Sequence, residues 1–319
     1  MPEGRRALVT GVTGQDGGYL AEQLLGEGWQ VTGLVRDADE VVTAGVDVEV
    51  GDLSDPDLFP ALLGRARPDV VFHLAGLSSV ARSWDEPALA ADVTGAAVAR
   101  LLGAVAAQET PPRVVVASSA EVFGGGDVSP QDEATPVRPG SPYGAAKAYA
   151  WHLARVYRAT GLFVSVALLY NHESPRRPDA FVTRKITRGA VDVARGAQQE
   201  LRLGNLDAVR DWGWAPDYVR ALRLMAQADA PDDFVVATGQ GRTVRELVAT
   251  AFAAAGVPAW EDHVVVDPRF YRPVDSVALV GDASHARRVL GWEPSVTFEE
   301  IVGEMVEADR AAAAVTGTS

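Results

Sequence analysis

The feature that most constrains the fold of this 319-residue chain is a glycine-rich turn near its start. Arg6–Thr10 reads as a short buried strand, Gly11, Gly14 and Gly17 follow it, and an amphipathic helix is expected from Tyr19 to Gly26. Glycines at these spacings permit a tight turn and let the backbone approach a pyrophosphate at the helix N-terminus. A glycine triplet alone is a weak signal, but at the first strand–helix turn it indicates a dinucleotide-binding fold.

Strands and helices alternate through the first half of the chain. Further strands are expected at 29–35, 47–50, 69–74, 113–117 and 163–170, with helices near 57–66, 87–108 and 142–160. Alternation of this kind, with mostly short connections, predicts an α/β fold built on a Rossmann-type doubly wound parallel sheet.

The regular alternation of strands and helices ends after Tyr170. Residues 171–178 read as a polar loop bounded by proline, and the segments beyond it are expected to be helices near 181–195, 216–228, 243–255, 284–290 and 297–313, with short strands near 200–204 and 234–237. We interpret residues 1–170 as a dinucleotide-binding Rossmann domain. Residues 171–319 are then a smaller C-terminal α/β substrate-binding region, some segments of which can return to the first sheet.

The end of the second strand bears on the choice between NADP and NAD. An acidic residue there hydrogen-bonds the ribose diol, whereas an arginine accommodates a 2′-phosphate. Because Arg36 comes first and Asp37 second, the sequence favours NADP over NAD. Further cofactor contacts are expected from the glycine turn and the ends of the third and fourth strands, namely Gly11, Thr13, Gly14, Gln15, Asp16, Gly17, Asp52, Leu53, Leu74, Ala75 and Gly76.

A second motif places Tyr143 four residues before Lys147, directly after Pro142, a residue type common at the first helical position. Two side chains four apart on a helix share one face. A free phenol titrates near ~10, and an ammonium held nearby favours the phenolate. We therefore expect Lys147 to lower the pKa of Tyr143, which would make the tyrosine a base for a sugar or alcohol hydroxyl.

Two polar residues complete this candidate site. Ser119 and Glu121 follow the fifth strand at its carboxyl end, where open parallel sheets carry their sites. The serine hydroxyl can orient the oxygen that the tyrosine deprotonates. The alternative interpretation, a surface Tyr and Lys on an amphipathic helix, is weakened by the presence of these two residues and of the glycine turn.

The composition excludes several other classes of protein. A net charge of −14 argues against nucleic acid as a partner, because phosphate binding needs clustered Lys and Arg. The absence of cysteine excludes disulfides and thiolate chemistry, and no His/Asp cluster has metal-ligand spacing, so we expect no metal. The chain has no run of eighteen apolar residues, so we expect no membrane span, and the short apolar run near the N-terminus is unlike a signal peptide. We therefore expect a cytoplasmic protein.

Motifs along nearly the whole chain resemble those of the extended short-chain dehydrogenase/reductases that act on nucleotide sugars, and within them look most like the GDP-mannose 4,6-dehydratases. The segments that carry the resemblance are Thr10–Gly17, Tyr19–Glu22, Asn171–Arg177, Phe181–Ile186, Leu203–Asp207, Arg210–Gly213, Asp233–Gly239, Tyr271–Pro273, Gly281–Asp282 and Leu290–Pro294. The family implies a lyase reaction in which a bound NADP oxidises C4 of a GDP-hexose, water leaves C5 and C6, and C6 is then reduced.

The resemblance also implies roles for single residues. Tyr143 would be the base at the sugar O4, Lys147 would tune it and bind the nicotinamide ribose, and Ser119 replaces the usual threonine. Glu121 would remove the C5 proton and help to expel the C6 hydroxyl, and Ala120 stands where serine is usual. The residues implied in substrate binding are Ser78, Asn171, Lys185, Arg210 and Arg272, with Asp275 at the position of a usual glutamate.

Two departures from the family pattern leave alternatives open. The basic insertion after the second strand is absent, which favours a homodimer over the tetramer that this insertion supports. The loop Ala75–Val80 is as similar to the 4-keto-sugar reductases as to the dehydratases. Another nucleotide-sugar dehydratase, an epimerase and GDP-4-keto-6-deoxymannose reductase are therefore alternatives. A non-catalytic cofactor-binding regulatory protein is a more remote one.

Overall fold

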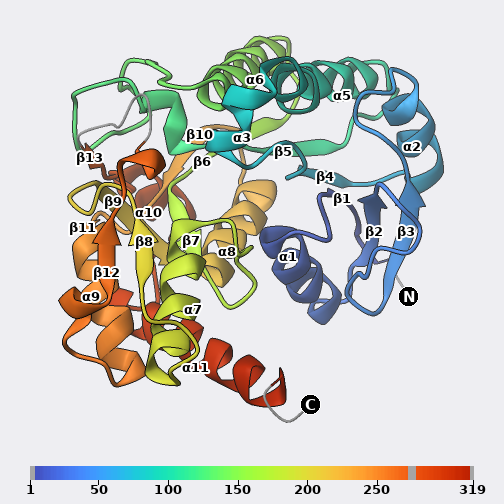
Figure 1. Ribbon diagram of the computed structural model, residues 1–319. Helices are drawn as coiled ribbons and strands as arrows, with labels where there is room; N and C mark the ends of the chain where they lie inside the picture. Colours follow the sequence, from blue (N-terminus) through green and yellow to red (C-terminus); the bar gives the residue numbers. More distant parts are fainter. Residues whose placement is uncertain (1–3, 272–277, 317–319) are drawn as a thin grey trace.

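The central feature of the computed structural model, which describes residues 4–271 and 278–316, is a parallel β-sheet (Figure 1). Within the described residues it has seven strands in the order β10-β6-β5-β4-β1-β2-β3, and every neighbouring pair is parallel. Their bounds are β1 Arg6–Thr10, β2 Gln30–Val35, β3 Val46–Val50, β4 Val70–His73, β5 Arg113–Ala117, β6 Val164–Leu169 and β10 Asp233–Val236. The predicted Rossmann-type doubly wound sheet is thereby confirmed.

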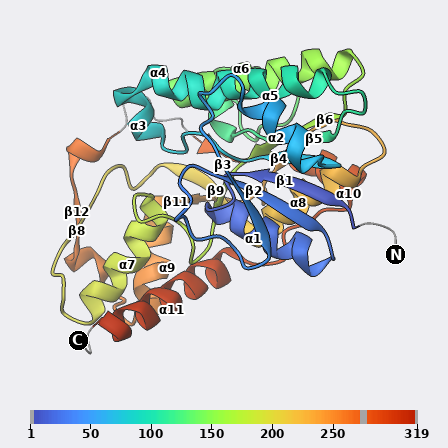
Figure 2. The same ribbon diagram turned by 90° about the vertical axis from the view of Figure 1, so that its right-hand side faces the viewer.

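Helices cover both faces of this sheet (Figure 2). One face carries α2 Leu58–Ala66, α5 Ala97–Ala106 and α6 Pro142–Ala159, and the other carries α1 Gln15–Gly26, α8 Ala215–Gln227 and α10 Ser284–Leu290. All six residues of β6 are buried, as expected of a parallel strand covered on both sides. The carboxyl ends of the strands therefore remain as the place where polar side chains can meet.

Two helices differ from their predicted extent. The first helix begins at Gln15 rather than Tyr19, because Gly14 caps it in an extended conformation. The predicted helix 87–108 is divided into α4 Pro87–Ala90, a π-helical stretch Ala91–Ala96 and α5, after a short helix α3 Val80–Asp85. The segment Pro87–Ala106 is long and apolar enough to cross a membrane, judged by length and composition only. Half of this apolar stretch is buried in the structure. Most of the buried side chains of α5 belong to the hydrophobic core.

A second layer of structure packs beside the sheet, at the lower left of Figure 1. Helices α7 Val182–Ala194, α9 Val244–Ala255 and α11 Phe298–Thr316 contact one another and enclose a hydrophobic core of their own. The remaining elements are short: β7 Asn171–Glu173, β8 Leu201–Leu203, β9 Val209–Trp214, β11 Gly241–Thr243, β12 Val264–Val266, β13 Ala278–Leu279 and the 3₁₀ turns Ala120–Phe123, Trp260–Asp262 and Pro268–Phe270.

The chain after residue 170 contributes to both parts of the molecule. The strand β10 pairs with β6, and α8 and α10 pack in the first hydrophobic core. A division into 1–170 and 171–319 stays a prediction. The sequence predicts a loop over 171–178, but Asn171–Glu173 forms β7 and pairs with β9. Its three polar residues have no alternation that marks a strand, and their partner lies about forty residues later, so local pattern could not indicate the pairing.

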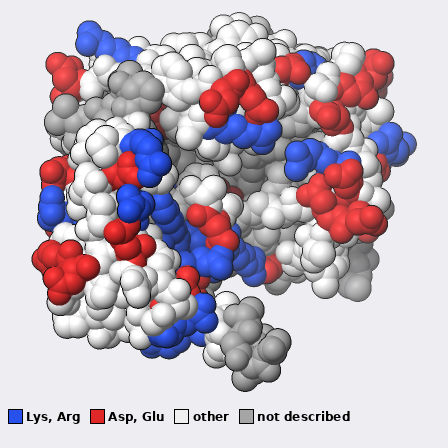
Figure 3. Space-filling model, viewed as in Figure 1, with Lys and Arg blue, Asp and Glu red and all other residues white. Residues whose placement is uncertain are grey.

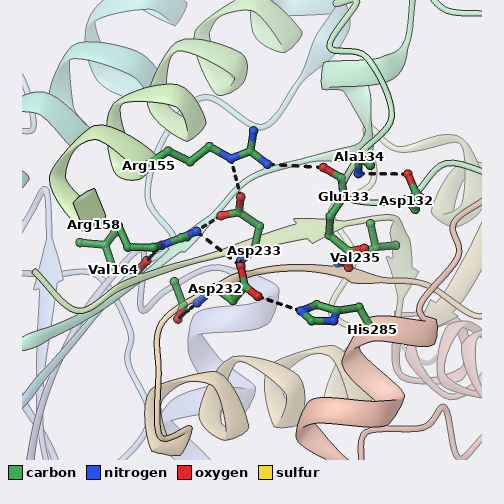
Figure 4. Close-up of polar contacts among 11 residues, drawn as sticks. Asp132, Glu133, Ala134, Arg155, Arg158, Val164, Asp232, Asp233, Val235 and His285 are labelled. Atoms are coloured by element: carbon green, nitrogen blue, oxygen red, sulfur yellow. Dashed lines mark hydrogen bonds and ion pairs between the residues drawn. The ribbon is translucent and has the colours of Figure 1, made fainter. Parts of the chain in front are cut away.

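A buried carboxylate ties α6 to the sheet (Figure 4). Asp233, at the start of β10, accepts hydrogen bonds from Arg155 Nε at 2.6 Å and from Arg158 Nη2 at 2.5 Å. Its side chain is only 3% exposed, so solvent screens these contacts weakly. Both arginines lie on α6, the helix that begins with Pro142. Their contact with Asp233 therefore helps to fix the orientation of α6, including its first turn, relative to the sheet.

Candidate active site

A cavity of about 440 Å³ lies at the carboxyl edge of the sheet. Figure 3 shows the hollow in the face of the molecule, with Lys and Arg side chains along its left side over α7 and β8. Its walls come from the ends of β4, β5 and β6, from the first turns of α6 and α7, and from the end of β8 and Gly204 after it. Ser119, Glu121, Tyr143 and Lys147, the four candidate catalytic residues, all line this cavity.

Tyr143 and Lys147 project from the first turns of α6. Ser141 caps the helix by accepting a hydrogen bond from Gly144 N at 3.0 Å, and Tyr143 N donates to the buried Ser83 Oγ at 3.2 Å. Lys147 Nζ lies 5.9 Å from the centroid of the Tyr143 ring. The spacing of four residues thus brings both side chains to one face, as the sequence predicts.

The protonation behaviour of this pair differs from the expectation. Burial raises the pKa of Tyr143 to about 12, the hydrogen bond with Ser119 opposes that rise, and the charge of Glu121 adds to it. Burial also lowers the pKa of Lys147 to about 8, and its Nζ donates to Ala117 O at 2.7 Å. The expectation of a lowered Tyr143 pKa is therefore wrong for the protein as described, because loss of solvation is the largest cause of the shift and raises the pKa.

Ser119 and Glu121 follow β5 directly. Ser119 Oγ accepts a hydrogen bond from Glu121 N at 3.3 Å and so caps the 3₁₀ turn Ala120–Phe123. The same hydroxyl hydrogen-bonds Tyr143. Ser118, which also lines the cavity, has a buried Oγ with no hydrogen-bond partner among the described residues. The sheet edge therefore presents two serine hydroxyls, a phenol, an amine and a carboxylate to one space.

The glycine turn has the geometry that a dinucleotide requires. Gly11 has φ +74°, and a Cβ on Gly17 would lie 2.1 Å from Gly11 O, so any side chain there would push α1 away from β1. Ala75 N donates to Thr10 Oγ1 at 3.2 Å, which joins the turns after β1 and β4. The N-terminus of α1 thus stands close to the strand ends, and the turn fits a pyrophosphate bound at that N-terminus.

The other predicted cofactor residues lie around this turn. Asp16, Leu74 and Gly76 line the cavity, whereas the remaining ones lie outside its lining: Gly11, Thr13, Gly14, Gln15, Gly17, Arg36, Asp52, Leu53 and Ala75. Asp52 Oδ1 accepts hydrogen bonds from Ser54, and Leu53 O accepts one from Arg100 Nε at 2.9 Å.

Asp16, which is partly exposed, forms a pair with the buried His172, a residue of β7. The His172 Nε2 atom lies 2.9 Å from Asp16 Oδ2, and its ring stacks on Tyr218 with centroids 4.7 Å apart. Burial opposes both charges, yet their mutual attraction and hydrogen bonding lower the pKa of Asp16 and raise that of His172. The pair joins the glycine turn to the segment after β6. Gln15 strengthens this link by donating to His172 O at 3.1 Å.

The predicted substrate residues divide into three groups. Ser78, Asn171 and Lys185 line the cavity, and Lys185 Nζ donates to Arg202 O at 2.6 Å. Arg210 is buried on β9 and does not line it, with Nη1 donating to Val209 O at 2.8 Å. The remaining two predicted residues, Arg272 and Asp275, lie outside the described residues.

The cavity wall also includes residues that the sequence patterns did not predict as part of the site, among them Arg177, Thr183 and Phe270. Arg177 lies within the Asn171–Arg177 motif, so its place in that motif was a usable signal. No sequence signal marks Phe270 as a cavity residue, because it reaches the cavity from a 3₁₀ turn nearly a hundred residues beyond β7. Within residues 4–271 and 278–316 there is no group of three or more His, Asp or Glu residues that could hold a metal ion.

The fold and the cavity together define a class. The molecule has a doubly wound parallel sheet with a glycine turn after β1, and a Tyr-x-x-x-Lys pair beside a serine at a strand end. These features are typical of an extended short-chain dehydrogenase/reductase. Residues 8–305 match the family model described as GDP-mannose 4,6 dehydratase. The chain belongs to this family, and the resemblance found in its motifs is confirmed.

Individual proteins agree with this assignment. GDP-mannose 4,6 dehydratase 2 of Arabidopsis thaliana is 44% identical over 95% of this chain and 86% of its own length. GDP-mannose 4,6 dehydratase of Homo sapiens is 40% identical over 95% of this chain and 91% of its own. Among solved structures, the UDP-glucose 4-epimerase of Thermus thermophilus in complex with NAD is 30% identical with a TM-score of 0.85, covering 96% of this chain and 99% of that one.

Proposed function

We propose that this chain is a GDP-mannose 4,6-dehydratase, which converts GDP-mannose to GDP-4-keto-6-deoxymannose. The observation that carries the proposal is that Glu121 meets Ser119, Tyr143 and Lys147 in one cavity. Oxidation or reduction at one carbon needs only a proton acceptor or donor at its oxygen. Loss of water between C5 and C6 needs a further acid/base, and a carboxylate at Glu121 supplies it.

The chain's own groups can carry each proton transfer. Ser119 and Tyr143, which hydrogen-bond each other, hold the sugar O4, and Tyr143 takes its proton as C4 becomes a ketone. The ketone acidifies the C5 hydrogen, which Glu121 removes as a proton and then gives to the C6 hydroxyl, so that water leaves. The hydride taken from C4 then returns to C6, and C5 regains a proton, which the Tyr143 phenol can supply. A bound nicotinamide dinucleotide would supply a reversible hydride acceptor and, when oxidised, a positive charge that favours the phenolate of Tyr143.

We assign the dinucleotide as NADP rather than NAD. Arg36 is exposed at the end of β2, where a guanidinium can meet two oxygens of a 2′-phosphate. The glycine turn supports a pyrophosphate in either case, because its contacts involve the backbone. The choice between the two cofactors therefore depends on the β2 end.

The substrate class is a GDP-hexose, whose diphosphate needs local positive charge in a chain of net charge −14. Lys185 and Arg177 line the cavity. Further arginines lie on α7 and the segment before it, namely Arg176, Arg184 and Arg188, and each forms an ion pair with a carboxylate. Figure 3 shows Lys and Arg side chains along this side of the hollow. Asp16, Glu121 and Glu173 line the same cavity, so a diphosphate would depend on direct contact with Lys185 and Arg177 rather than on the charge of the whole wall.

We further propose a homodimer. The solvent face of α6 exposes Tyr149 at 52% and Val156 at 60%, and the two residues are seven apart, so they lie on one stripe of the helix. Burial of such an exposed apolar stripe against a second copy of the chain is more favourable than its exposure to water. A cytoplasmic location stays a prediction.

A redox-balance experiment tests the dehydratase proposal. Purified protein with GDP-mannose and a trace of NADP⁺ should yield a product lighter by one water, with no net change in the absorbance of reduced nicotinamide. Starting from sugar deuterated at C4, the label should reappear at C6. Tyr143→Phe should lower turnover about 10²–10⁴-fold, the range expected for loss of a general base, while cofactor binding stays intact.

Glu121→Gln separates the dehydratase from its alternatives. It should stall the reaction after the first oxidation, so that reduced cofactor accumulates, because the C5 proton then has no acceptor. Stoichiometric use of NADPH on a 4-keto sugar by the wild type would instead establish a reductase. Tight cofactor binding without turnover of any nucleotide hexose would establish a regulatory protein.

A further inference from the structure

Glu40 stands at the place where the cofactor's adenosine ribose is expected. Its Oε1 accepts hydrogen bonds from the backbone N–H of Arg36 at 2.8 Å and of Asp37 at 3.2 Å, and its Oε2 accepts one from Thr13 Oγ1 at 2.9 Å. These donors come from two different elements, the end of β2 and the glycine turn. One carboxylate therefore bridges both.

The two bridged elements are the ones that flank the ribose in dinucleotide-binding folds. The glycine turn holds the pyrophosphate, and the residue about twenty positions later, at the end of β2, reads the ribose 2′ position. Thr13 and Arg36 occupy these positions in this chain. Two backbone N–H groups and a hydroxyl that converge on one anion form a binding site for negative charge.

We propose that Glu40 determines the choice between NADP and NAD, because its carboxylate occupies the anion site that a 2′-phosphate would use and must leave that site when NADP binds. The inference rests on the proposed use of NADP. Its consequence is that the preference for NADP is smaller than Arg36 alone would produce.

Electrostatics support displacement over coexistence. The three hydrogen bonds and the charge of Arg36 lower the pKa of Glu40, so it is ionised at neutral pH. A phosphate monoester carries about −1.5 to −2 charges at pH 7. Two anions cannot share the same three donors, and the guanidinium of Arg36 cannot neutralise both.

Glu40→Gln tests the proposal through binding alone. Glutamine keeps an oxygen that can accept from the N–H groups but removes the charge. Titration calorimetry with NADP⁺ and NAD⁺ should show the ratio of their affinities shifting toward NADP⁺ by at least about tenfold, equivalent to about 1.4 kcal/mol. The same shift is expected between 2′,5′-ADP and 5′-ADP, which differ in where the second phosphate sits. Asp39→Asn, the loss of a neighbouring exposed charge, is the matched control and should move neither ratio.

Three outcomes would overturn the proposal: an unchanged ratio in Glu40→Gln, a weaker NADP⁺ affinity in that variant, or an equal shift in Asp39→Asn. Circular dichroism and melting temperature establish that the variants are folded, and Glu40→Ala gives a second charge-free variant for the same titrations. Because no sugar is present, the result is independent of the dehydratase assay, and either one can fail without the other.

Discussion

At the scale of single residues, burial dominates the chemistry of the cavity. Tyr143 and Lys147 are 9% and 8% exposed, and each is held toward its neutral form. A buried amine without a carboxylate in contact costs free energy that the fold must supply elsewhere. The fold retains Lys147 nonetheless, as is common where a functional group is placed in an unfavourable environment.

This burial predicts a pH-dependent difference between the wild type and Lys147→Met. The folded pKa of Lys147, about 8, lies below the ordinary value of 10.5, so the unfolded chain binds more protons between these two pH values. Folding stability of the wild type should therefore rise relative to Lys147→Met as the pH increases from about 8 to about 10.5, by up to about 3 kcal/mol. Urea unfolding of both proteins across this range measures the difference.

Tyr143 is present in both proteins, so its own titration cancels when the two stabilities are subtracted. Lys185→Met is the control, because Lys185 is only partly buried and the protein therefore desolvates its ammonium less completely. A stability difference that is flat between pH 8 and 10.5 would contradict the assignment of Lys147 as an amine held in an unfavourable environment.

At the scale of elements, α6 carries two of the candidate catalytic residues and is fixed at both halves. Its first turn is held by Ser83, and its later turns are held by Asp233 through Arg155 and Arg158 (Figure 4). Glu133 joins the same network: its carbonyl oxygen accepts a hydrogen bond from Arg155 Nη2 at 3.4 Å, and its carboxylate accepts one from Val235 N at 2.7 Å. The orientation of the first turn thus depends on a strand that comes much later in the chain.

Asp233→Asn should lower the free energy of unfolding by about 2–3 kcal/mol, because two arginines lose a buried, charged acceptor. Chemical denaturation measures this change. Asp232→Asn is the matched control next to it: its carboxylate is 52% exposed, so a loss of less than about 1 kcal/mol is expected. Equal losses in both variants would show that the buried position of Asp233 does not matter.

At the scale of the whole molecule, two hydrophobic cores meet at one cavity. The first lies on the seven-stranded sheet and the second among α7, α9 and α11, and the cavity is lined from both sides. The sheet side offers the candidate catalytic groups, whereas the α7 side offers positive charge. Binding of an anionic sugar nucleotide would therefore engage both parts at once.

The exposed stripe on α6 predicts the assembly state. Light scattering should give the mass of a dimer for the wild type and of a monomer for Val156→Glu, since a charge in the middle of an apolar interface is costly to bury. Val289→Glu, at a residue of α10 that is 53% exposed, is the control and should leave the dimer intact. A monomeric wild type would contradict the proposal.

The sequence by itself determined the order and type of the main elements and the candidate site residues that local spacing reveals. Strand–helix alternation, a glycine turn with close packing at Gly17, and the four-residue step from Tyr143 to Lys147 are all written in short stretches of chain. Local periodicity and backbone sterics act over a few residues, which is why these features can be predicted.

Only the tertiary structure decided the properties that depend on residues far apart in the chain. Asp16 and His172 are 156 positions apart, and Lys147 donates to a carbonyl 30 positions before it. Contacts that no local pattern encodes also produce the pairing of β7, the raised pKa of Tyr143 and the hydrogen bond from Thr13 to Glu40. The physical reason is that burial and electrostatic neighbourhood are set by packing, and packing brings together segments whose sequences carry no mark of one another.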